Sequence, residues 1–240
     1  MTSQRLPDAV LRPLSDTHVF ASTVERLGAA IRLGVFARGD QLPPERELAA
    51  KLGVSRVNLR EAIAALREAD MVQTRRGRGG GTTVTYAGSV AQPINRAEVR
   101  RQSPQLADAL NYRRVVEPGA AYLAANSRLT ADQRDWLAES EAAVRLAGPG
   151  PASRIADSRL HLAVATLSGS PMLIEAVTRV QSSLDGVLCV LTALPGTIEQ
   201  SHQSHSAVVA AILAGDPLAA RAEMERHCDT TAALLRTLME

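Results

Sequence analysis

Repeated helix-start signals are the feature of this sequence that most restricts its fold. A helix-capping residue stands directly before proline at three places, Ser103-Pro104, Ser170-Pro171 and Asp216-Pro217. Such pairs are typical of helix starts, because the capping side chain accepts a hydrogen bond from a free backbone amide and proline fits the first turn. Nothing after residue 103 is typical of a strand. The second half of the chain is therefore predicted to be all helical.

Two further helix starts in this half are capping boxes, in which glutamine follows threonine by three residues. They are Thr130 with Gln133 and Thr197 with Gln200. The glycines and prolines of residues 148–151 indicate a loop. The predicted helices lie near residues 104–126, 130–146, 153–168, 171–192, 197–214 and 217–238.

The chain before residue 87 has a different pattern. Apolar spacing and flanking glycines predict short helices at 23–33, 45–52 and 55–69, the last capped by Ser55. Two β-prone segments follow, at 71–74 and 82–86, joined by a loop rich in glycine and arginine. Three helices followed by a small hairpin form a winged helix-turn-helix.

The expected fold class is mainly α: an N-terminal winged helix-turn-helix of three helices plus a β-hairpin wing, followed by an all-α helical-bundle domain. The winged helix-turn-helix is assigned to residues 18–86 and the helical domain to residues 103–240. Residues 1–17 are expected to form a flexible arm and residues 87–102 a linker, because both carry scattered proline and polar residues.

Composition adds two constraints. Aromatic residues make up only 2% of the chain, which favours helix packing through aliphatic side chains and argues against readers of single-stranded nucleic acid. Residues 1–86 carry 13 basic against 9 acidic residues, whereas residues 87–240 carry 14 against 16. This asymmetry modestly favours a polyanion partner for the first part.

The remaining composition indicates a cytoplasmic protein. Cys189 and Cys228 are far apart and form no metal or redox motif, which suits a reducing compartment. No targeting leader opens the sequence, and its apolar runs are too short to span a bilayer. We therefore expect no membrane partner.

The N-terminal domain carries a specific family signature. Residues 42–49 (LPPERELA), 53–56 (GVSR) and 60–62 (REA), with the glycine-rich wing, resemble GntR-type regulators over residues 20–86. The resemblance implies that DNA is contacted by five residues, namely Arg46, Ser55, Arg56, Arg60 and wing residue Gly77.

The helix that begins at Ser55 has the chemistry expected of a recognition helix. Its first turn offers free amides and a positive dipole end to phosphate. Arg56 and Arg60 are four residues apart and share one face, from which either can bind a guanine edge. Asn58 could contact adenine or could be a solvated helix residue.

The arginines of the wing have two possible roles, as have those of the helices. Wing residues Arg75, Arg76 and Arg78 are expected to contact phosphates or the minor groove, adding affinity more than specificity. The alternative is that each arginine is a surface charge paired with a neighbour such as Glu61.

The second half resembles the helical (FCD-type) ligand-binding domain of the FadR-like branch of the same family. Its marks over residues 104–236 include Arg113 before Glu117-Pro118, Asp157 before His161, and later His205 and His227. Asp157 and His161 are four residues apart on one predicted helix, and the other two histidines lie on two more helices. Leu160 and Ser170 depart from the family pattern, but neither is a predicted ligand.

Three helices of a bundle can direct such side chains into one cavity. Asp157, His161, His205 and His227 suit a divalent metal ion, foremost zinc, with nickel or manganese as alternatives. His202 falls off the pattern and is expected at the surface or beside the ligands. The alternative is that all of them are ordinary core or surface histidines.

Arg113 is expected to bind the effector, because a guanidinium beside a bound metal can hold a carboxylate with two hydrogen bonds while the metal takes one oxygen. The implied effector is a small organic acid, a sugar acid or an amino-acid-like anion. The alternative role for Arg113 is a helical salt bridge with Glu117.

The leading hypothesis is a homodimeric, ligand-responsive regulator of palindromic operator DNA, with repression preferred over activation and no enzyme activity. A metal-dependent hydrolase is a second hypothesis, although the sequence has no H-E-x-x-H pairing. A regulator with a purely structural metal is the third.

Overall fold

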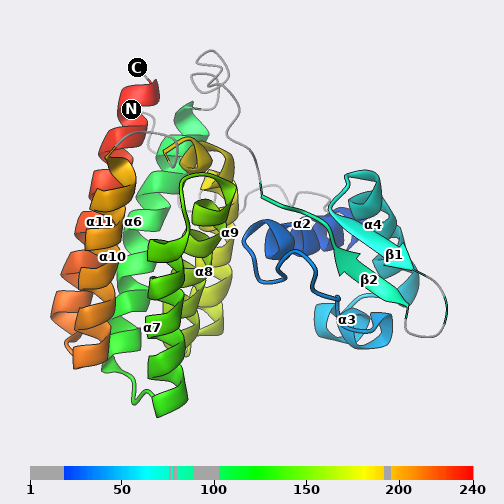
Figure 1. Ribbon diagram of the computed structural model, residues 1–240, viewed down its shortest axis with the longest axis horizontal. Helices are drawn as coiled ribbons and strands as arrows, with labels where there is room; N and C mark the ends of the chain where they lie inside the picture. Colours follow the sequence, from blue (N-terminus) through cyan, green and yellow to red (C-terminus); the bar gives the residue numbers. More distant parts are fainter. Residues whose placement is uncertain (1–18, 76, 78–79, 89–102, 192–195, 240) are drawn as a thin grey trace, which may run out of the picture.

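The computed structural model describes residues 19–75, 77, 80–88, 103–191 and 196–239. The predicted arm at 1–17 and all but two residues of the predicted linker at 87–102 lie outside this part of the chain. The described residues form a smaller N-terminal domain beside a larger bundle of long helices (Figure 1).

The N-terminal domain consists of three helices and a two-stranded antiparallel sheet. Its elements are α2 (Val19–Arg32), α3 (Glu45–Leu52), α4 (Arg56–Glu68), β1 (Val72–Arg75) and β2 (Gly81–Val84). Val72 pairs with Val84 and Arg75 with Gly81, so the strands form a hairpin. The core contains buried aliphatic side chains such as Ile31, Leu59 and Leu66. The predicted winged helix-turn-helix is confirmed.

Two local signals set the turn between α3 and α4. Gly53 has a φ of 65°, and its amide donates to the carbonyls of Ala49 and Ala50, which ends α3. Ser55 Oγ then accepts a hydrogen bond of 3.1 Å from the amide of Asn58, which starts α4. The turn therefore follows from a glycine that tolerates the left-handed region and from the predicted serine cap.

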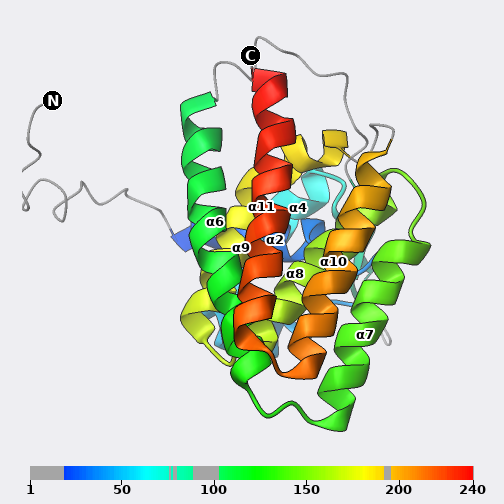
Figure 2. The ribbon, with the colours of Figure 1, turned by 90° about the vertical axis from the view of Figure 1, so that its left-hand side faces the viewer.

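The helical domain contains α6 (Ser103–Asn126), α7 (Ala131–Leu146), α8 (Pro151–Leu167), α9 (Pro171–Leu191), α10 (Thr197–Ala214) and α11 (Pro217–Met239). Helix α11 lies between α6 and α10, and α7 flanks α10 (Figure 2). Helices α8 and α9 pack against each other on the side that faces the N-terminal domain (Figure 1). The predicted all-α bundle is confirmed.

The helix starts agree with the sequence at one capping box and disagree at the other. Thr130 and Gln133 exchange hydrogen bonds with each other's backbone amides, as predicted. The box at Thr197 is wrong, because Gly196 precedes the helix with a φ of 79° and provides no side-chain cap. The hydroxyl of Thr197 donates instead to the carbonyl of Leu191 at 2.6 Å.

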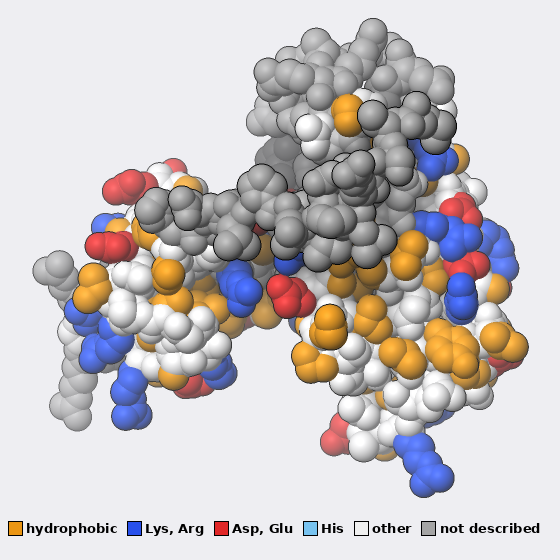
Figure 3. All heavy atoms as spheres, turned by 180° about the vertical axis from the view of Figure 1, so that it is seen from behind, with side chains coloured by type: hydrophobic (Ala, Val, Ile, Leu, Met, Phe, Trp, Pro, Cys, Tyr) orange, Lys and Arg blue, Asp and Glu red, His pale blue; other side chains and the backbone are white. Residues whose placement is uncertain are grey.

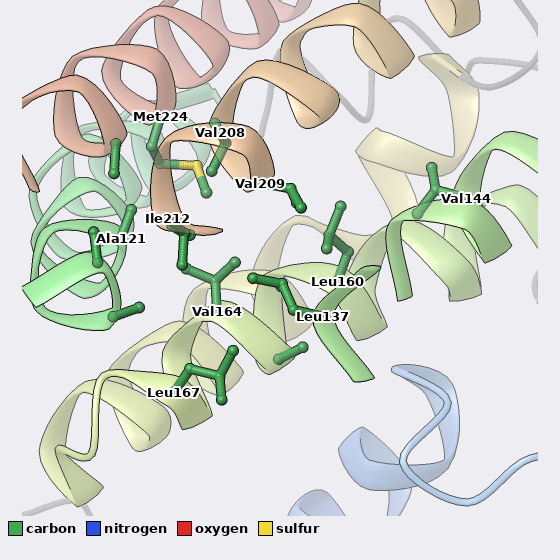
Figure 4. Close-up of a cluster of buried hydrophobic side chains, with 14 of the residues drawn as sticks. Ala121, Leu137, Val144, Leu160, Val164, Leu167, Val208, Val209, Ile212 and Met224 are labelled. Carbon is green, nitrogen blue, oxygen red and sulfur yellow. The ribbon is translucent and has the colours of Figure 1, made fainter. Parts of the chain in front are cut away.

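The core of the helical domain is almost entirely aliphatic, as the low aromatic content requires. In one cluster Leu137, Leu160 and Ile212 interlock with Val208 and Met224 (Figure 4). Side chains from α7, α8, α10 and α11 thus meet in one dry layer. Among the described residues, no helix is long and apolar enough to cross a membrane.

The two domains touch through α2 and the residues that follow it. Arg32 Nη2 donates to Ser182 Oγ of α9 at 3.2 Å, and Leu33 is fully buried in the core of the helical domain. Gly34 has a φ of 73°, and a Cβ there would lie 2.4 Å from Ile155 Cγ2 of α8. A glycine is therefore required where the N-terminal domain meets α8.

Candidate DNA interface and metal centre

The first candidate site is the exposed start of α4. Arg56 and Arg60 are 59% and 61% exposed, so both guanidinium groups are accessible. Ser55 caps the helix, and Asn58 is half-buried beside it. Arg46 is exposed on α3. Basic and apolar side chains share the surface of this domain in the view from behind (Figure 3).

The arginines of α4 do have an acidic partner, but it is not the one expected. Glu45 Oε2 lies 2.7 Å from Arg60 Nε and 3.9 Å from Arg56 Nη2, whereas neither arginine forms an ion pair with Glu61 within the described chain. Glu45 is the first residue of α3, which packs against α4. Exposed pairs of this kind contribute only about 0–1 kcal/mol, so phosphate can replace the carboxylate.

The wing is only partly described. Gly77 is exposed and has a φ of 103°, a left-handed conformation that suits the tip of a hairpin. Arg76 and Arg78 lie outside the described residues. Arg75 is exposed at the end of β1.

A groove that the sequence analysis missed joins α4 to the wing. It has a volume of about 680 Å³ and is lined by residues that include Arg60, Arg67 and Arg75. Arg67 was not among the predicted DNA contacts. Its position seven residues after Arg60 places it on the same face of α4, and this periodicity could have identified it.

The second candidate site is a cluster of three buried histidines in the helical domain. His161 comes from α8, His205 from α10 and His227 from α11. One ligand nitrogen of each lies within 4.8 Å of the others, and the ring centroids are 4.5–5.4 Å apart. Three helices therefore direct their imidazoles to one point, as the sequence predicted.

Asp157, the fourth predicted ligand, borders this cluster. Its Oδ1 lies 3.3 Å from His205 Nε2 and 3.9 Å from His161 Nε2. Asp157 also forms an ion pair with the buried Arg154, three residues earlier on α8. It is not one of the three residues whose ligand atoms all lie within 4.8 Å of one another. Two ligand atoms about 2.0–2.2 Å from a tetrahedral metal lie about 3.3 Å apart, so the distance from Asp157 to His205 suits a shared cation.

Arg113 lies between the histidines and a carboxylate. Its Nε donates to Glu117 Oε2 at 2.9 Å, so the helical salt bridge considered as an alternative is present. Its Nη2 lies 3.0 Å from His227 Nε2 and 3.4 Å from His161 Nε2. Its Nη1 is buried and makes no hydrogen bond within the described residues. Arg113 therefore combines the salt bridge with a position beside the histidines.

Glu117 organises the region behind the histidines. It accepts hydrogen bonds from Arg113 and, at 2.6 Å, from Gln181 Nε2, and its Oε2 lies 3.0 Å from His161 Nδ1. Burial tends to raise the pKa of Glu117, but the charge of Arg113, the charge of and hydrogen bond from His161, and the hydrogen bond from Gln181 together outweigh burial and hold that pKa well below its ordinary value. An ionised Glu117 orients His161 with Nε2 toward the cluster.

The donor set fits a divalent cation. Burial, against the attraction of Asp157, lowers the pKa of His205 to about 4. Burial, assisted by His205 and Arg113, also lowers the pKa of His227 well below its ordinary value. Both imidazoles are therefore neutral near pH 7, the form that binds metal. Neither ring nitrogen of His205 makes a hydrogen bond within the described residues, although both are buried. A bound cation would satisfy one of them.

A small cavity adjoins the cluster. Its volume is about 70 Å³, and its lining includes Arg113, Asp157, His202 and His227. His202 is half-buried at this cavity, beside the three histidines. A cavity of this size holds a few waters or a small ligand.

Sequence reasoning missed the buried polar network beside this cavity. Arg154 donates to Asp185 Oδ1 at 3.1 Å and to Gln181 Oε1 at 2.7 Å, and it pairs with Asp157. Only a contact map could identify Asp185 and Gln181, which are 31 and 27 residues away from Arg154. Arg154 itself precedes Asp157 by one helical turn, which is a weak signal of their pairing.

Family models match both domains. Residues 21–84 match the bacterial regulatory proteins of the gntR family, and residues 108–230 match the FCD domain. FCD domains often bind metal, and all three clustered histidines lie in the matched range.

Similar proteins are regulators. An Escherichia coli K12 protein named for regulation of the L-lactate dehydrogenase operon is 32% identical over 90% of this chain and 84% of its own length. The repressor NanR of Cronobacter sakazakii is 27% identical over 95% of this chain and 90% of its own length. RmpR of Mycobacterium gastri is 35% identical over 72% of this chain, and the match spans 63% of RmpR, less than two thirds of its length.

A solved structure shows the same fold. Escherichia coli McbR/YncC superposes with a TM-score of 0.53 and 21% identity, covering 92% of this chain and 99% of that one. The family model and the curated relatives are those of transcription regulators and not of enzymes, so the expectation of no enzyme activity is confirmed and the hydrolase alternative loses its support. With family models matched over both domains and a relative that is 32% identical over 90% of this chain, the chain belongs to the gntR family of bacterial regulatory proteins and carries an FCD domain.

Proposed function

We propose that this protein is a homodimeric repressor that binds palindromic operator DNA and responds to a small carboxylate at a metal-containing pocket of its helical domain. The observation that carries the proposal is the buried cluster of His161, His205 and His227 beside Arg113, in a domain packed against a winged helix-turn-helix. Regulation requires only that the ligand bind one arrangement of the domains better than another.

The DNA-contact assignment rests on the exposed face of α4. Ser55, Arg56 and Arg60 stand at the amino end of this helix, where amides, dipole and guanidinium groups favour phosphate and guanine. Arg46 and Gly77 keep the contact roles that the family signature implies, and the half-buried Asn58 remains a weaker candidate. Arg67 and Arg75 are added because they line the same groove as Arg60.

The metal assignment rests on the donor set. Three neutral imidazoles with one nearby carboxylate suit zinc, with nickel or manganese less favoured, and Asp157 is the proposed fourth ligand. A bound metal would supply a Lewis-acid contact for one oxygen of the effector. Arg113 supplies the second contact, because its guanidinium already lies at the histidine nitrogens.

The proposed class of effector follows from the two positive groups, the metal and the guanidinium of Arg113. A carboxylate can contact the metal with one oxygen and Arg113 with the other. The cavity of about 70 Å³ favours a small acid. A relative named for regulation of the L-lactate dehydrogenase operon is consistent with a short hydroxy acid, and NanR is named a repressor.

The dimer is supported by exposed apolar side chains on the helical domain. Val115 and Met172 are 72% and 83% exposed, and apolar side chains spread over this domain in the view from behind (Figure 3). Exposed apolar surface marks protein interfaces where it is contiguous, and these side chains of α6 and α9 are the ones that we propose the partner covers. A two-fold dimer would place two recognition helices on half-sites one helical turn apart, which predicts a palindromic operator.

Four measurements on one preparation test the proposal. Elemental analysis should find about one metal ion per chain, and light scattering should give a dimer. DNA selected from a random library should be palindromic, and L-lactate or a related short acid should weaken its binding at least about tenfold. Purified, metal-loaded protein that selects no duplex sequence would overturn the DNA-binding assignment. A sequence-specific dimer without metal would overturn only the metal-dependent part.

A further inference from the structure

A second cavity lies between the two domains, apart from the cavity in the bundle. Its volume is about 550 Å³. One wall comes from the segment after α2 and the segment after β2, and the other comes from α7 and α8 (Figure 1). Small-molecule sites typically have volumes of about 300–1,000 Å³ and occur preferentially at domain interfaces. Both the size and the location of this cleft therefore suit a small ligand.

The cleft collects a large share of the few aromatic side chains in the protein. The sequence contains one tryptophan, three tyrosines and two phenylalanines, six aromatic residues in all. Three of them, Phe36, Tyr86 and Trp136, line this cleft. Trp136 is 38% exposed, although large aromatic side chains gain free energy from burial. These side chains offer flat apolar surfaces to a ring-shaped ligand.

The charges of the cleft favour an anion. Arg38 of the N-terminal domain and Arg159 of α8 both line it, and no ion pair of either is found among the described residues. Glu139 is the one carboxylate in the lining, so two guanidinium groups and one carboxylate leave a net charge of +1. The charge balance therefore matches one negative charge on a ligand.

Close backbone contacts hold the two walls together. A Cβ on Gly34 would lie 2.4 Å from Ile155 Cγ2, and a Cβ on Gly88 would lie 2.5 Å from the Cβ of Pro151. Both glycines have positive φ values, and both pack against α8. The walls therefore meet without intervening side chains, and the cleft exists before any ligand binds.

We propose that this interdomain cleft is a binding site for a small aromatic monocarboxylate, whose ring packs on Trp136 and Phe36 and whose carboxylate binds Arg38 and Arg159. The ligand contacts both domains at once. It is therefore separate in place and chemistry from the carboxylate pocket of the bundle, and it does not depend on DNA binding or on a metal.

The single tryptophan provides a direct assay. Biphenyl-4-carboxylate is titrated into the full-length protein while Trp136 emission is followed, and the affinity is measured by calorimetry. We expect a saturable change in emission. The neutral biphenyl-4-carboxamide should bind at least about tenfold more weakly, because it cannot form charge-assisted hydrogen bonds with the arginines.

Variants place the ligand. Arg38→Ala and Arg159→Ala should each weaken the carboxylate about tenfold. Ala143→Leu, which adds volume at an exposed lining position of α7, should abolish the emission change without affecting the fold. Arg179→Ala, on an exposed face of α9 outside the cleft lining, is the matched control and should leave the affinity unchanged.

Three results would overturn the proposal. The first is an absence of saturable emission change in the wild-type protein. The second is equal affinity for the acid and the amide, or unchanged affinity in Ala143→Leu. The third is a change in Trp136 emission with protein concentration alone, because a second copy of the chain would then cover the cleft.

Discussion

The two domains use arginine in opposite ways. Arg56 and Arg60 of α4 are 59% and 61% exposed and share one partly exposed carboxylate, Glu45. Arg113 and Arg154 of the helical domain are 2% and 4% exposed and are surrounded by carboxylates and other polar groups. Exposed pairs contribute little and exchange readily, whereas a buried charge without its partners is strongly destabilising. The exposed arginines are therefore accessible to another molecule, whereas the buried arginines fix the positions of the polar side chains around them.

The largest expected effect comes from the buried arginines. Arg154→Ala should reduce the free energy of unfolding by about 3–5 kcal/mol, because the buried Asp185 and the half-buried Asp157 would lose their shared cation. Urea denaturation measures the change. Arg179→Ala, on the exposed face of α9, is the control and should cost less than about 0.5 kcal/mol. If both variants lost a similar, small amount of unfolding free energy, the proposed difference between buried and exposed arginines would be wrong.

Metal binding should depend on the histidines that surround Arg113. The double variant His205→Ala, His227→Ala should lose at least about a hundredfold in zinc affinity, because two of three converging ligands are removed. Elemental analysis after dialysis and competition with a chelator measure the loss. His202→Ala is the matched control, since His202 lines the cavity but is not in the three-histidine cluster. Equal metal content in the double variant and the control would reject the site.

The exposed arginines should matter for DNA and not for stability. Arg56→Ala and Arg60→Ala should each cost about 1–3 kcal/mol of operator binding through a lost base contact. The same changes should alter the free energy of unfolding by less than about 1 kcal/mol. Fluorescence anisotropy with selected DNA measures the binding, and Arg128→Ala in the loop before α7 is the control. Unchanged affinity in both variants would contradict the recognition-helix assignment.

The smallest effect is expected at Glu45, the acidic partner of the recognition helix. Glu45→Gln should change the free energy of unfolding by about 0–1 kcal/mol. It should also strengthen DNA binding slightly, because the arginines lose a competing carboxylate and the interface loses a negative charge. Glu61→Gln is the matched control, because Glu61 is also exposed on α4 but is not paired with these arginines within the described chain. Weaker DNA binding in Glu45→Gln alone would show that the carboxylate positions the arginines for contact.

Much of the local structure was predictable because its causes are local. The cap at Ser55, the box at Thr130 and the glycine after α3 each act within a few residues, and each occurs as predicted. The capping box predicted at Thr197 is wrong because a more distant partner competes for its hydroxyl. Its hydroxyl donates to the carbonyl of Leu191 at the end of α9, a competing partner that a capping pattern does not register.

The partners of the predicted site residues were less predictable. The exposed arginines of α4 pair with Glu45 on α3 and not with the adjacent Glu61, because helix packing sets which face meets which. Arg154 and Gln181 were missed because their contacts span 27 residues of sequence. Asp157 was predicted as a ligand beside the histidines, and its additional ion pair with Arg154 was not predicted.

By itself, the sequence determined where most helices start and stop, that a hairpin follows three short helices, and which residues are candidates for DNA contact and metal binding. These properties depend on caps, periodicity and motif spacing, which act over a few residues or are written directly in the chain. Only the tertiary structure decided that three imidazoles from α8, α10 and α11 meet within 4.8 Å, that Arg113 lies against them, and that a cleft opens between the domains. Those features depend on how distant helices pack, and packing is set by the whole core at once and not by any local pattern.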